Sequence, residues 1–143
     1  GYKADINEEK TMAKAAAELT YAFADATVPK VNLIIGKAYG SAYISMNSKH
    51  IGADYVFALP NAELGMMDAK LAAQIIYDGE SAETINQKSE EYASLQNGAL
   101  SAAKRGYVDN IIEAETVRKH LVYAFEMLYL KSEARPVRKH GSF

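Results

Sequence analysis

Three short apolar runs constrain the fold of this chain more than any other feature. They cover residues 31–36, 54–59 and 107–112, and β-branched or aromatic side chains are frequent in each. Pro29 and Gly36 bound the first run, which is typical of a short buried strand. The stretches between the runs are long enough to cross back over a sheet. The pattern therefore predicts an α/β fold with parallel strands.

Helical periodicity accounts for most of the remaining sequence. Asn7 and Asp68 are the expected N-caps of two helices, because their side chains can accept from free backbone N–H groups. The helix over 81–97 is mostly acidic and polar, so we expect it to lie in solvent. The apolar stripe of the last helix consists of Val117, Leu121, Ala124, Phe125 and Leu128. The predicted helices cover residues 7–26, 41–48, 68–77, 81–97, 98–105 and 114–131, and residues 132–143 form an extended basic tail.

Composition excludes several classes of function. The chain has 143 residues with 16 Lys+Arg against 18 Asp+Glu, and a net charge of −2 leaves no basic excess for binding nucleic acid. It has no cysteine, which excludes disulfides, thiolate catalysis and Cys-ligated zinc. No run approaches the ~18 apolar residues of a membrane-spanning helix. Residues 1–5 show no export signal, so we expect a cytoplasmic protein.

The junction between the first apolar run and the next helix is the best candidate for a functional site. A strand that ends in glycine, a turn of small residues and a helix start together leave backbone N–H groups unpaired. Gly40, Ser41 and Ala42 would let an anion or an oxyanion approach those groups closely. A tight turn that uses glycine only for packing is the alternative. Tyr39 and Tyr43 flank the junction and are expected to line a pocket.

Other chemistry fits the residues less well. Neither the phosphate-loop pattern G-x-x-x-x-G-K-[ST] nor G-x-G-x-x-G is present. Ser41 lacks the G-x-S-x-G context of a nucleophile elbow, and His50 falls toward the far end of the same predicted helix, so a catalytic triad is not predicted. His50, His120 and His140 are not spaced for one helix face, and no metal site is predicted.

Four sequence blocks resemble a known family. They are K-A-Y-G-S-A-Y at 37–43, G-A-D at 52–54, P-N-A-E at 60–63 and G-Y-V-D-N-I-I at 106–112. Together they resemble the carboxyltransferase subunit of biotin-dependent enzymes. This group contains the propionyl-CoA and methylcrotonyl-CoA carboxylase β subunits. It also contains the α subunits of the sodium-pumping glutaconyl-CoA and methylmalonyl-CoA decarboxylases. The resemblance covers essentially the whole chain.

The resemblance implies a crotonase-like (ClpP/crotonase) α/β fold built of ββα units. Residues 1–143 would form the C-terminal, biotin-side part of the second carboxyltransferase domain. The family moves a carboxyl group between N1′ of biotin and the α-carbon of an acyl-CoA. It relies on oriented backbone amides more than on side-chain acids and bases, which agrees with the residues of the junction.

The resemblance also implies roles for single residues. Ile44 falls where the family varies a pocket residue, and an apolar side chain there suits a short acyl chain. The family usually has glycine at the positions of Ser41 and Asp68, so both are departures from its pattern. The implied catalytic set is Gly40 with the backbone amides of Ser41 and Ala42, and the implied substrate-binding set is Tyr39, Tyr43 and Ile44.

The implied cofactor is biotin on a partner carrier protein, and the implied substrate is an acyl-CoA; no metal is implied. The implied partners are a biotin carboxyl carrier protein, an N-terminal acyl-CoA-binding domain that this chain lacks, and further copies in a homo-oligomer. A membrane is involved only indirectly, in the case of a sodium-pump decarboxylase.

The chain alone is expected to be inactive. The alternatives are a non-catalytic assembly or dimerisation segment of the same subunit, or another crotonase-fold enzyme such as a hydratase or a Clp-type serine protease. The direction, carboxylase or decarboxylase, stays open.

Overall fold

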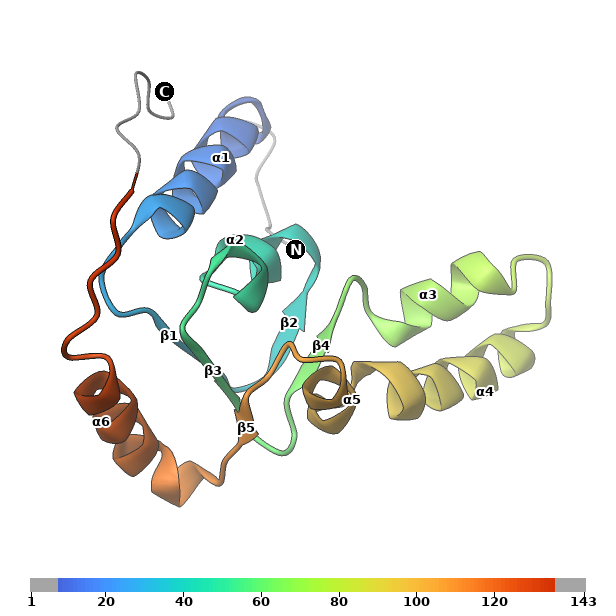
Figure 1. The fold of residues 1–143 in the computed structure, drawn as a ribbon. Helices are drawn as coiled ribbons and strands as arrows, with labels where there is room; N and C mark the ends of the chain where they lie inside the picture. Colours follow the sequence, from blue (N-terminus) through green and yellow to red (C-terminus); the bar gives the residue numbers. More distant parts are fainter. Residues whose placement is uncertain (1–7, 136–143) are drawn as a thin grey trace.

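A parallel sheet of three strands lies at the centre of the fold (Figure 1). The computed structural model describes residues 8–135, so the predicted cap Asn7 and the end of the basic tail lie outside the described residues. The three apolar runs form the strands of this sheet, in the order β1-β3-β5, although β5 is shorter than its run. They are β1 (Val31–Ile34), β3 (Tyr55–Ala58) and β5 (Asn110–Ile111). The prediction of parallel pairing is confirmed.

A second parallel sheet of two strands was not predicted. It pairs β2 (Lys37–Tyr39) with β4 (Glu63–Gly65), and Tyr39 lies opposite Gly65. Each strand of this sheet follows a strand of the first sheet along the chain, and a helix follows in turn. The chain therefore repeats a strand–strand–helix unit, first over β1, β2 and α2 and then over β3, β4 and α3.

The helices follow the predicted order, with different ends. The predicted helix at 41–48 begins at Gly40 and ends at Ser45, and the last α-helix ends at Met127. Glu8 takes the N-cap position of the first helix, without a side-chain cap. The α-helices are α1 (Glu9–Asp25), α2 (Gly40–Ser45), α3 (Ala69–Ile76), α4 (Ala82–Tyr92), α5 (Ala99–Lys104) and α6 (Val117–Met127). A π-helical turn, η2 (Ala93–Asn97), follows α4, and 3₁₀ turns form η1 (Lys49–Ile51) and η3 (Ala114–Thr116).

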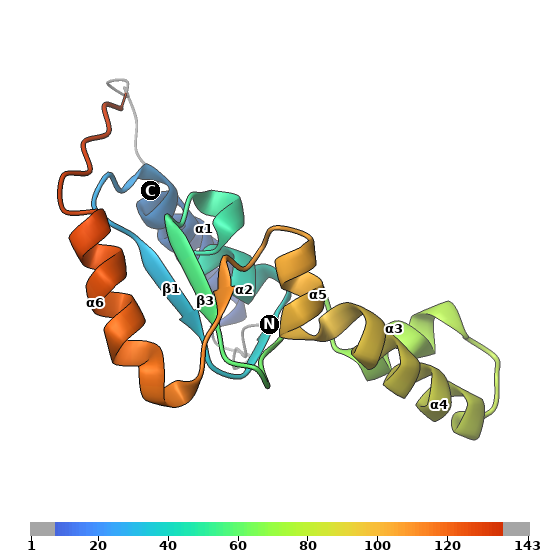
Figure 2. The ribbon, with the colours of Figure 1, turned by 60° about the horizontal axis from the view of Figure 1, so that its bottom comes forward.

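The two faces of the three-stranded sheet carry separate apolar clusters, since side chains alternate along a strand. Val56 and Ala58 of β3 pack with Tyr43 of α2, whereas Phe57 packs with Ala124 of α6. Helix α6 thus covers one face and α2 lies on the other, as Figures 1 and 2 show. The predicted stripe of α6 is wrong at Phe125, which is 48% exposed.

Helices α3 and α4 form a hairpin that stands away from the two sheets (Figure 2). Asp68 caps α3 as predicted, because its carboxylate accepts from the Lys70 backbone N–H at 3.0 Å. Small buried residues on α3, including Ala72 and Ala73, allow a close approach between helices. None of the α4 side chains is buried, so the prediction of a helix in solvent is confirmed for Ala82–Tyr92, but it is wrong at Asn97, which is buried. Within residues 8–135, no helix combines the length and apolar character needed to cross a membrane.

Candidate functional site

The turn between β2 and α2 requires glycine at position 40. Gly40 has φ +64°, in the left-handed region that L side chains rarely adopt. A Cβ on Gly40 would also lie 3.2 Å from the carbonyl oxygen of Met66, which belongs to the segment after β4. Tyr39, before it, has extended backbone with φ −123° and ψ 145°. The chain therefore reverses from strand to helix within one residue, against the backbone of a neighbouring loop.

The first turn of α2 carries the predicted backbone amides. The first N–H groups of a helix have no partner inside that helix. No side chain among the described residues caps α2, so the N–H groups of this turn are not taken by a cap. The Ser41 side chain is exposed, whereas Ala42 is half-buried. The structure thus brings Gly40, Ser41 and Ala42 together at one turn, as their adjacency in the sequence requires.

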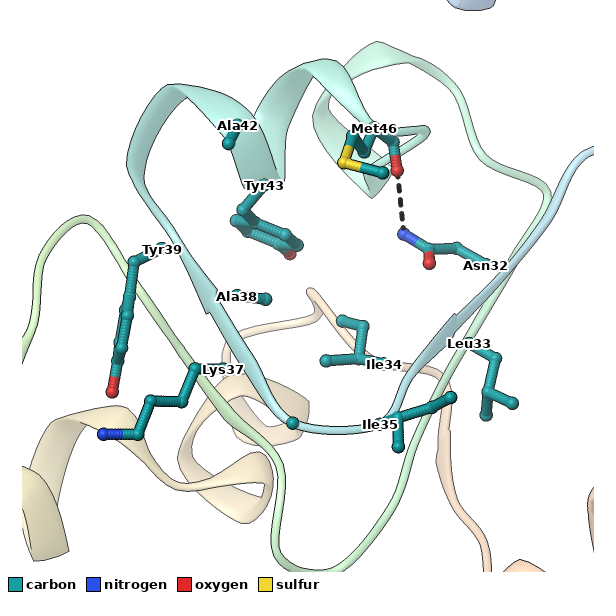
Figure 3. Close-up of a pocket in the computed structure, with 11 residues that line it drawn as sticks. Asn32, Leu33, Ile34, Ile35, Lys37, Ala38, Tyr39, Ala42, Tyr43 and Met46 are labelled. Atoms are coloured by element: carbon teal, nitrogen blue, oxygen red, sulfur yellow. Dashed lines mark hydrogen bonds between the residues drawn. The ribbon is translucent and has the colours of Figure 1, made fainter. Parts of the chain in front are cut away.

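A cavity of about 280 Å³ adjoins this turn (Figure 3). It lies between β1, β2 and α2, and its walls are mostly apolar. Three of the predicted site residues line it, namely Tyr39, Ala42 and Tyr43. Ile44 instead packs against the core cluster, and its predicted role in acyl selection stays a prediction. The full lining is Asn32, Leu33, Ile34, Ile35, Gly36, Lys37, Ala38, Tyr39, Ala42, Tyr43 and Met46.

Tyr43 places a polar group without a partner at the cavity. Its side chain is 9% exposed, and Figure 3 shows the ring projecting from α2 toward Ala38 and Ile34. The hydroxyl oxygen is buried and forms no hydrogen bond with any residue that the structure describes. Burial raises the pKa of Tyr43, so the hydroxyl stays protonated at neutral pH. An unpaired buried hydroxyl costs about 1–3 kcal/mol.

Tyr39, on the opposite wall, is held by charged neighbours. Its hydroxyl donates a hydrogen bond to the carboxylate of Glu63 on β4. Burial and this hydrogen bond raise the pKa of Tyr39 well above the usual range, so Tyr39 acts as a neutral donor and not as a base. The Lys37 ammonium lies 3.8 Å from Glu63 and 3.8 Å from Asp68, at an exposed position where such pairs contribute little.

His50 and His120 do not form a catalytic pair with Ser41, and His140 lies outside the described residues. The Nδ1 atom of His50 lies 3.3 Å from the Ser48 hydroxyl, and its ring stacks on Tyr107 at 4.8 Å between centroids. His120 lies 3.0 Å from the Thr116 carbonyl. Within residues 8–135, no group of three His, Cys, Asp or Glu side chains is arranged to hold a metal ion. The site thus offers backbone donors, which suit the stabilisation of negative charge on oxygen.

Comparison with known proteins decides the family. A family profile described as the carboxyl transferase domain matches residues 4–143. This chain belongs to that family. It is 52% identical over 132 residues to the putative propionyl-CoA carboxylase beta chain of Bacillus subtilis (strain 168), covering 88% of this chain and 26% of that protein. It is 45% identical over 132 residues to the methylmalonyl-CoA decarboxylase subunit alpha of Propionigenium modestum, again covering 88% and 26%.

Solved structures of this family share the fold. A transcarboxylase 12S crystal structure with methylmalonyl-coenzyme A and methylmalonic acid bound superposes with a TM-score of 0.94 at 37% identity. The match covers 100% of this chain and 28% of that chain. The fold is therefore the crotonase-like α/β fold of carboxyltransferases, as the resemblance implied. This chain spans about a quarter of the length of the relatives that it matches.

Two polar residues of this region were not predicted from the sequence as part of the site. Glu63 lies in the resembling block at 60–63, but nothing in the sequence alone pairs it with Tyr39. Asn97 is only 2% exposed, at the end of the π-helical turn. The Asn97-Gly98 pair is a turn signal that marks the end of the predicted helix. It gives no indication that the asparagine contacts β2.

Proposed function

We propose that this chain is the biotin-side segment of an acyl-CoA carboxyltransferase subunit. The reaction transfers a carboxyl group between carboxybiotin and the α-carbon of a short acyl-CoA. The observation that carries the proposal is the β2–α2 turn, where Gly40 packs against the Met66 carbonyl and directs the uncapped first turn of α2 outward. Family membership supports the reaction class, because carboxylase, decarboxylase and carboxyltransferase subunits are among its relatives.

The uncapped first turn of α2, beside the cavity, fits the ureido group of biotin. When bound, biotin supplies the ureido nitrogen that carries the carboxyl group. The residues that would hold it are Ser41 and Ala42 through their backbone amides, with Tyr39 and the ring of Tyr43 as parts of the adjoining wall. Ile44 is proposed to favour a short acyl chain from its half-buried place beside Tyr43.

The chemistry of the chain is electrostatic. The amides of Ser41 and Ala42 donate to an oxygen on which negative charge grows as the carboxyl group leaves. Removing one such donor from an oxyanion site costs about 2.7–4 kcal/mol in other enzymes. The Tyr39 hydroxyl donates its proton to Glu63 and stays neutral, so Tyr39 does not act as a base. Leu33, Ile34 and Met46 form the apolar part of the cavity wall.

The working enzyme requires more than this chain. We propose that another part of the subunit supplies the acyl-CoA site and that a biotin carboxyl carrier protein delivers biotin, with several copies assembled. The coverage of about a quarter of each relative supports this division. The transcarboxylase 12S protein is described as a hexamer assembly.

The test is carboxyl transfer by the full-length subunit that carries this chain, with free biotin as acceptor and methylmalonyl-CoA as donor. Gly40→Ala is expected to lower kcat about 100-fold, because it displaces the amide donors. Gly106→Ala is the matched control, since Gly106 also has positive φ (+82°) but open space around it. Full activity of Gly40→Ala would contradict the proposed site. A subunit without biotin-dependent turnover would favour the non-catalytic assembly segment.

A further inference from the structure

Asn97 connects three elements behind the candidate site. Its side chain is 2% exposed, and its Nδ2 atom lies 3.4 Å from the Tyr39 hydroxyl and 3.5 Å from the Met67 carbonyl. A Cβ on Gly65 would lie 3.1 Å from its Oδ1 atom, so the backbone of β4 approaches the amide closely. Asn97 does not line the cavity. Any effect on the site must therefore pass through its neighbours.

One route runs through Tyr39. The Tyr39 hydroxyl accepts a long hydrogen bond from Asn97 and donates one to Glu63, so the phenol oxygen is held from two sides. Tyr39 is the last residue of β2 and the N-cap position of α2, directly before Gly40. Fixing the tyrosine ring therefore fixes the end of the strand from which the turn departs. A hydrogen bond in a buried position is electrostatically stronger than the same bond in water.

A second route runs through the segment after β4. Asn97 donates to the Met67 carbonyl, and the adjacent Met66 carbonyl is the atom that packs behind Gly40. The same segment is held at its other end, where the Asp68 carboxylate caps α3. Both routes converge on Gly40. The side chain of Asn97 thus supports the turn at Gly40 through β2, which precedes the turn, and through the Met66–Met67 segment, which packs against it.

The backbone around Asn97 supports a special role. Asn97 ends the π-helical turn η2, a wider turn than the α-helix that precedes it. Single π-helical turns are rare and occur frequently at functional sites. Gly98, immediately after, forms a bridge with Glu63, the carboxylate partner of Tyr39. The π-helical turn is thus tied to β4 by backbone and side chain together.

We propose that Asn97 is a positioning residue for the carboxyl transfer, holding Tyr39 and the Met66–Met67 backbone so that the amides of Ser41 and Ala42 keep their orientation. This inference rests on the proposed function. It extends the site to a residue 58 positions away from Tyr39 in the sequence. Its role is to orient donors, so it acts on the chemical step and not on the binding of acyl-CoA.

The test uses Asn97→Leu in the full-length subunit, because the leucine side chain is of similar size but cannot donate a hydrogen bond. Asn86→Leu on the exposed side of α4 is the matched control, since it makes the same chemical change in solvent. We expect Asn97→Leu to lower kcat about 10- to 100-fold, with the acyl-CoA KM within about twofold of wild type. Tyr39→Phe is expected to lower kcat, and the double variant is expected to be little worse than either single one.

Hydrogen exchange measured on the same proteins separates positioning from a general loss of structure. Faster exchange confined to peptides that cover 39–43 and 65–67 would support the inference. Faster exchange that extends to α6 would overturn it, because Asn97 would then be needed only for folding. Unchanged kcat in Asn97→Leu, or a raised KM with unchanged kcat, would also overturn it. A wild-type subunit that transfers no carboxyl group would instead refute the proposed function, and the positioning role with it.

Discussion

Three glycines of this chain separate the two reasons why the β2–α2 turn needs glycine. Gly40 and Gly106 both have positive φ, +64° and +82°. A Cβ on Gly106 would meet nothing within 4 Å, whereas a Cβ on Gly40 would lie 3.2 Å from the Met66 carbonyl oxygen. Gly36 has neither a strained φ nor a close neighbour. Gly36→Ala therefore measures the effect of the substitution alone. Gly106→Ala adds backbone strain, and Gly40→Ala adds both backbone strain and a steric clash.

The expected free energies of unfolding follow from this geometry. An L residue in the left-handed region costs about 1–2 kcal/mol, and the reduced freedom of the unfolded chain offsets about 0.4–1 kcal/mol. Gly106→Ala should therefore destabilise by about 1 kcal/mol. At Gly40 the clash adds an overpacking cost of about 1–3 kcal/mol, for about 2–4 kcal/mol in all. Gly36→Ala should stay within about 0.5 kcal/mol of wild type.

Urea denaturation of the 143-residue chain, followed by far-ultraviolet circular dichroism, measures all three variants. The free energy of unfolding should decrease in the order Gly36→Ala, Gly106→Ala, Gly40→Ala, with equal slopes against urea. Equal free energies of unfolding for Gly40→Ala and Gly106→Ala would show that the Met66 carbonyl moves away from the new Cβ without loss of stability. The turn would then not be fixed by packing, and the orientation of the amides would lose its structural basis.

Three further predictions concern single side chains. Ser41→Ala should keep carboxyl transfer within about threefold, because the amide remains, and a loss above about tenfold would point to chemistry at the hydroxyl. Asp54→Asn should destabilise the chain by about 3 kcal/mol at neutral pH, because the Lys131 ammonium lies 2.8 Å from the largely buried Asp54 carboxylate. Burial opposes ionisation of Asp54, but hydrogen bonds from Lys131 and from the Lys30 backbone N–H outweigh burial and lower the pKa of Asp54. The difference in free energy of unfolding between Asp54→Asn and wild type should therefore shrink only below about pH 4, which a series of denaturation curves at acid pH would measure. The raised pKa of Tyr39 predicts a stability contribution that is intact below pH 10.0 and is lost as the pH rises further, and a denaturation series of Tyr39→Phe should lack that alkaline loss.

The sequence predicted the three-stranded sheet because each of its strands has a local apolar signal. The β2–β4 pair was not predicted, because its strands have no such local apolar signal. Lys37 and Glu63 are polar residues in strands of three residues, and only their pairing with each other makes them strands. The wide turn ending at Asn97 also depends on distant contacts. A strand that forms only because it pairs with a distant segment cannot be predicted from its local sequence pattern.

The same distinction applies to the site. Gly40, Ser41 and Ala42 could be singled out because a strand–glycine–helix junction exposes amides wherever it occurs. The contact of Gly40 with Met66 and that of Tyr39 with Glu63 could not, since each joins segments that are distant in the sequence. The resemblance supplied the roles of the amides, and the structure supplies the backbone that supports them.

Only residues 35 and 36 separate β1, in one sheet, from β2, in the other. The position of the α2 amides relative to the central sheet is therefore set by a fixed length of backbone, while the walls of the cavity are set by side chains. These two properties can change independently during evolution. Substitutions at the wall can adapt the cavity to a different substrate without moving the amides, whereas a single insertion between β1 and β2 would displace them. A fold of this kind can diversify in selectivity while its chemical step is conserved.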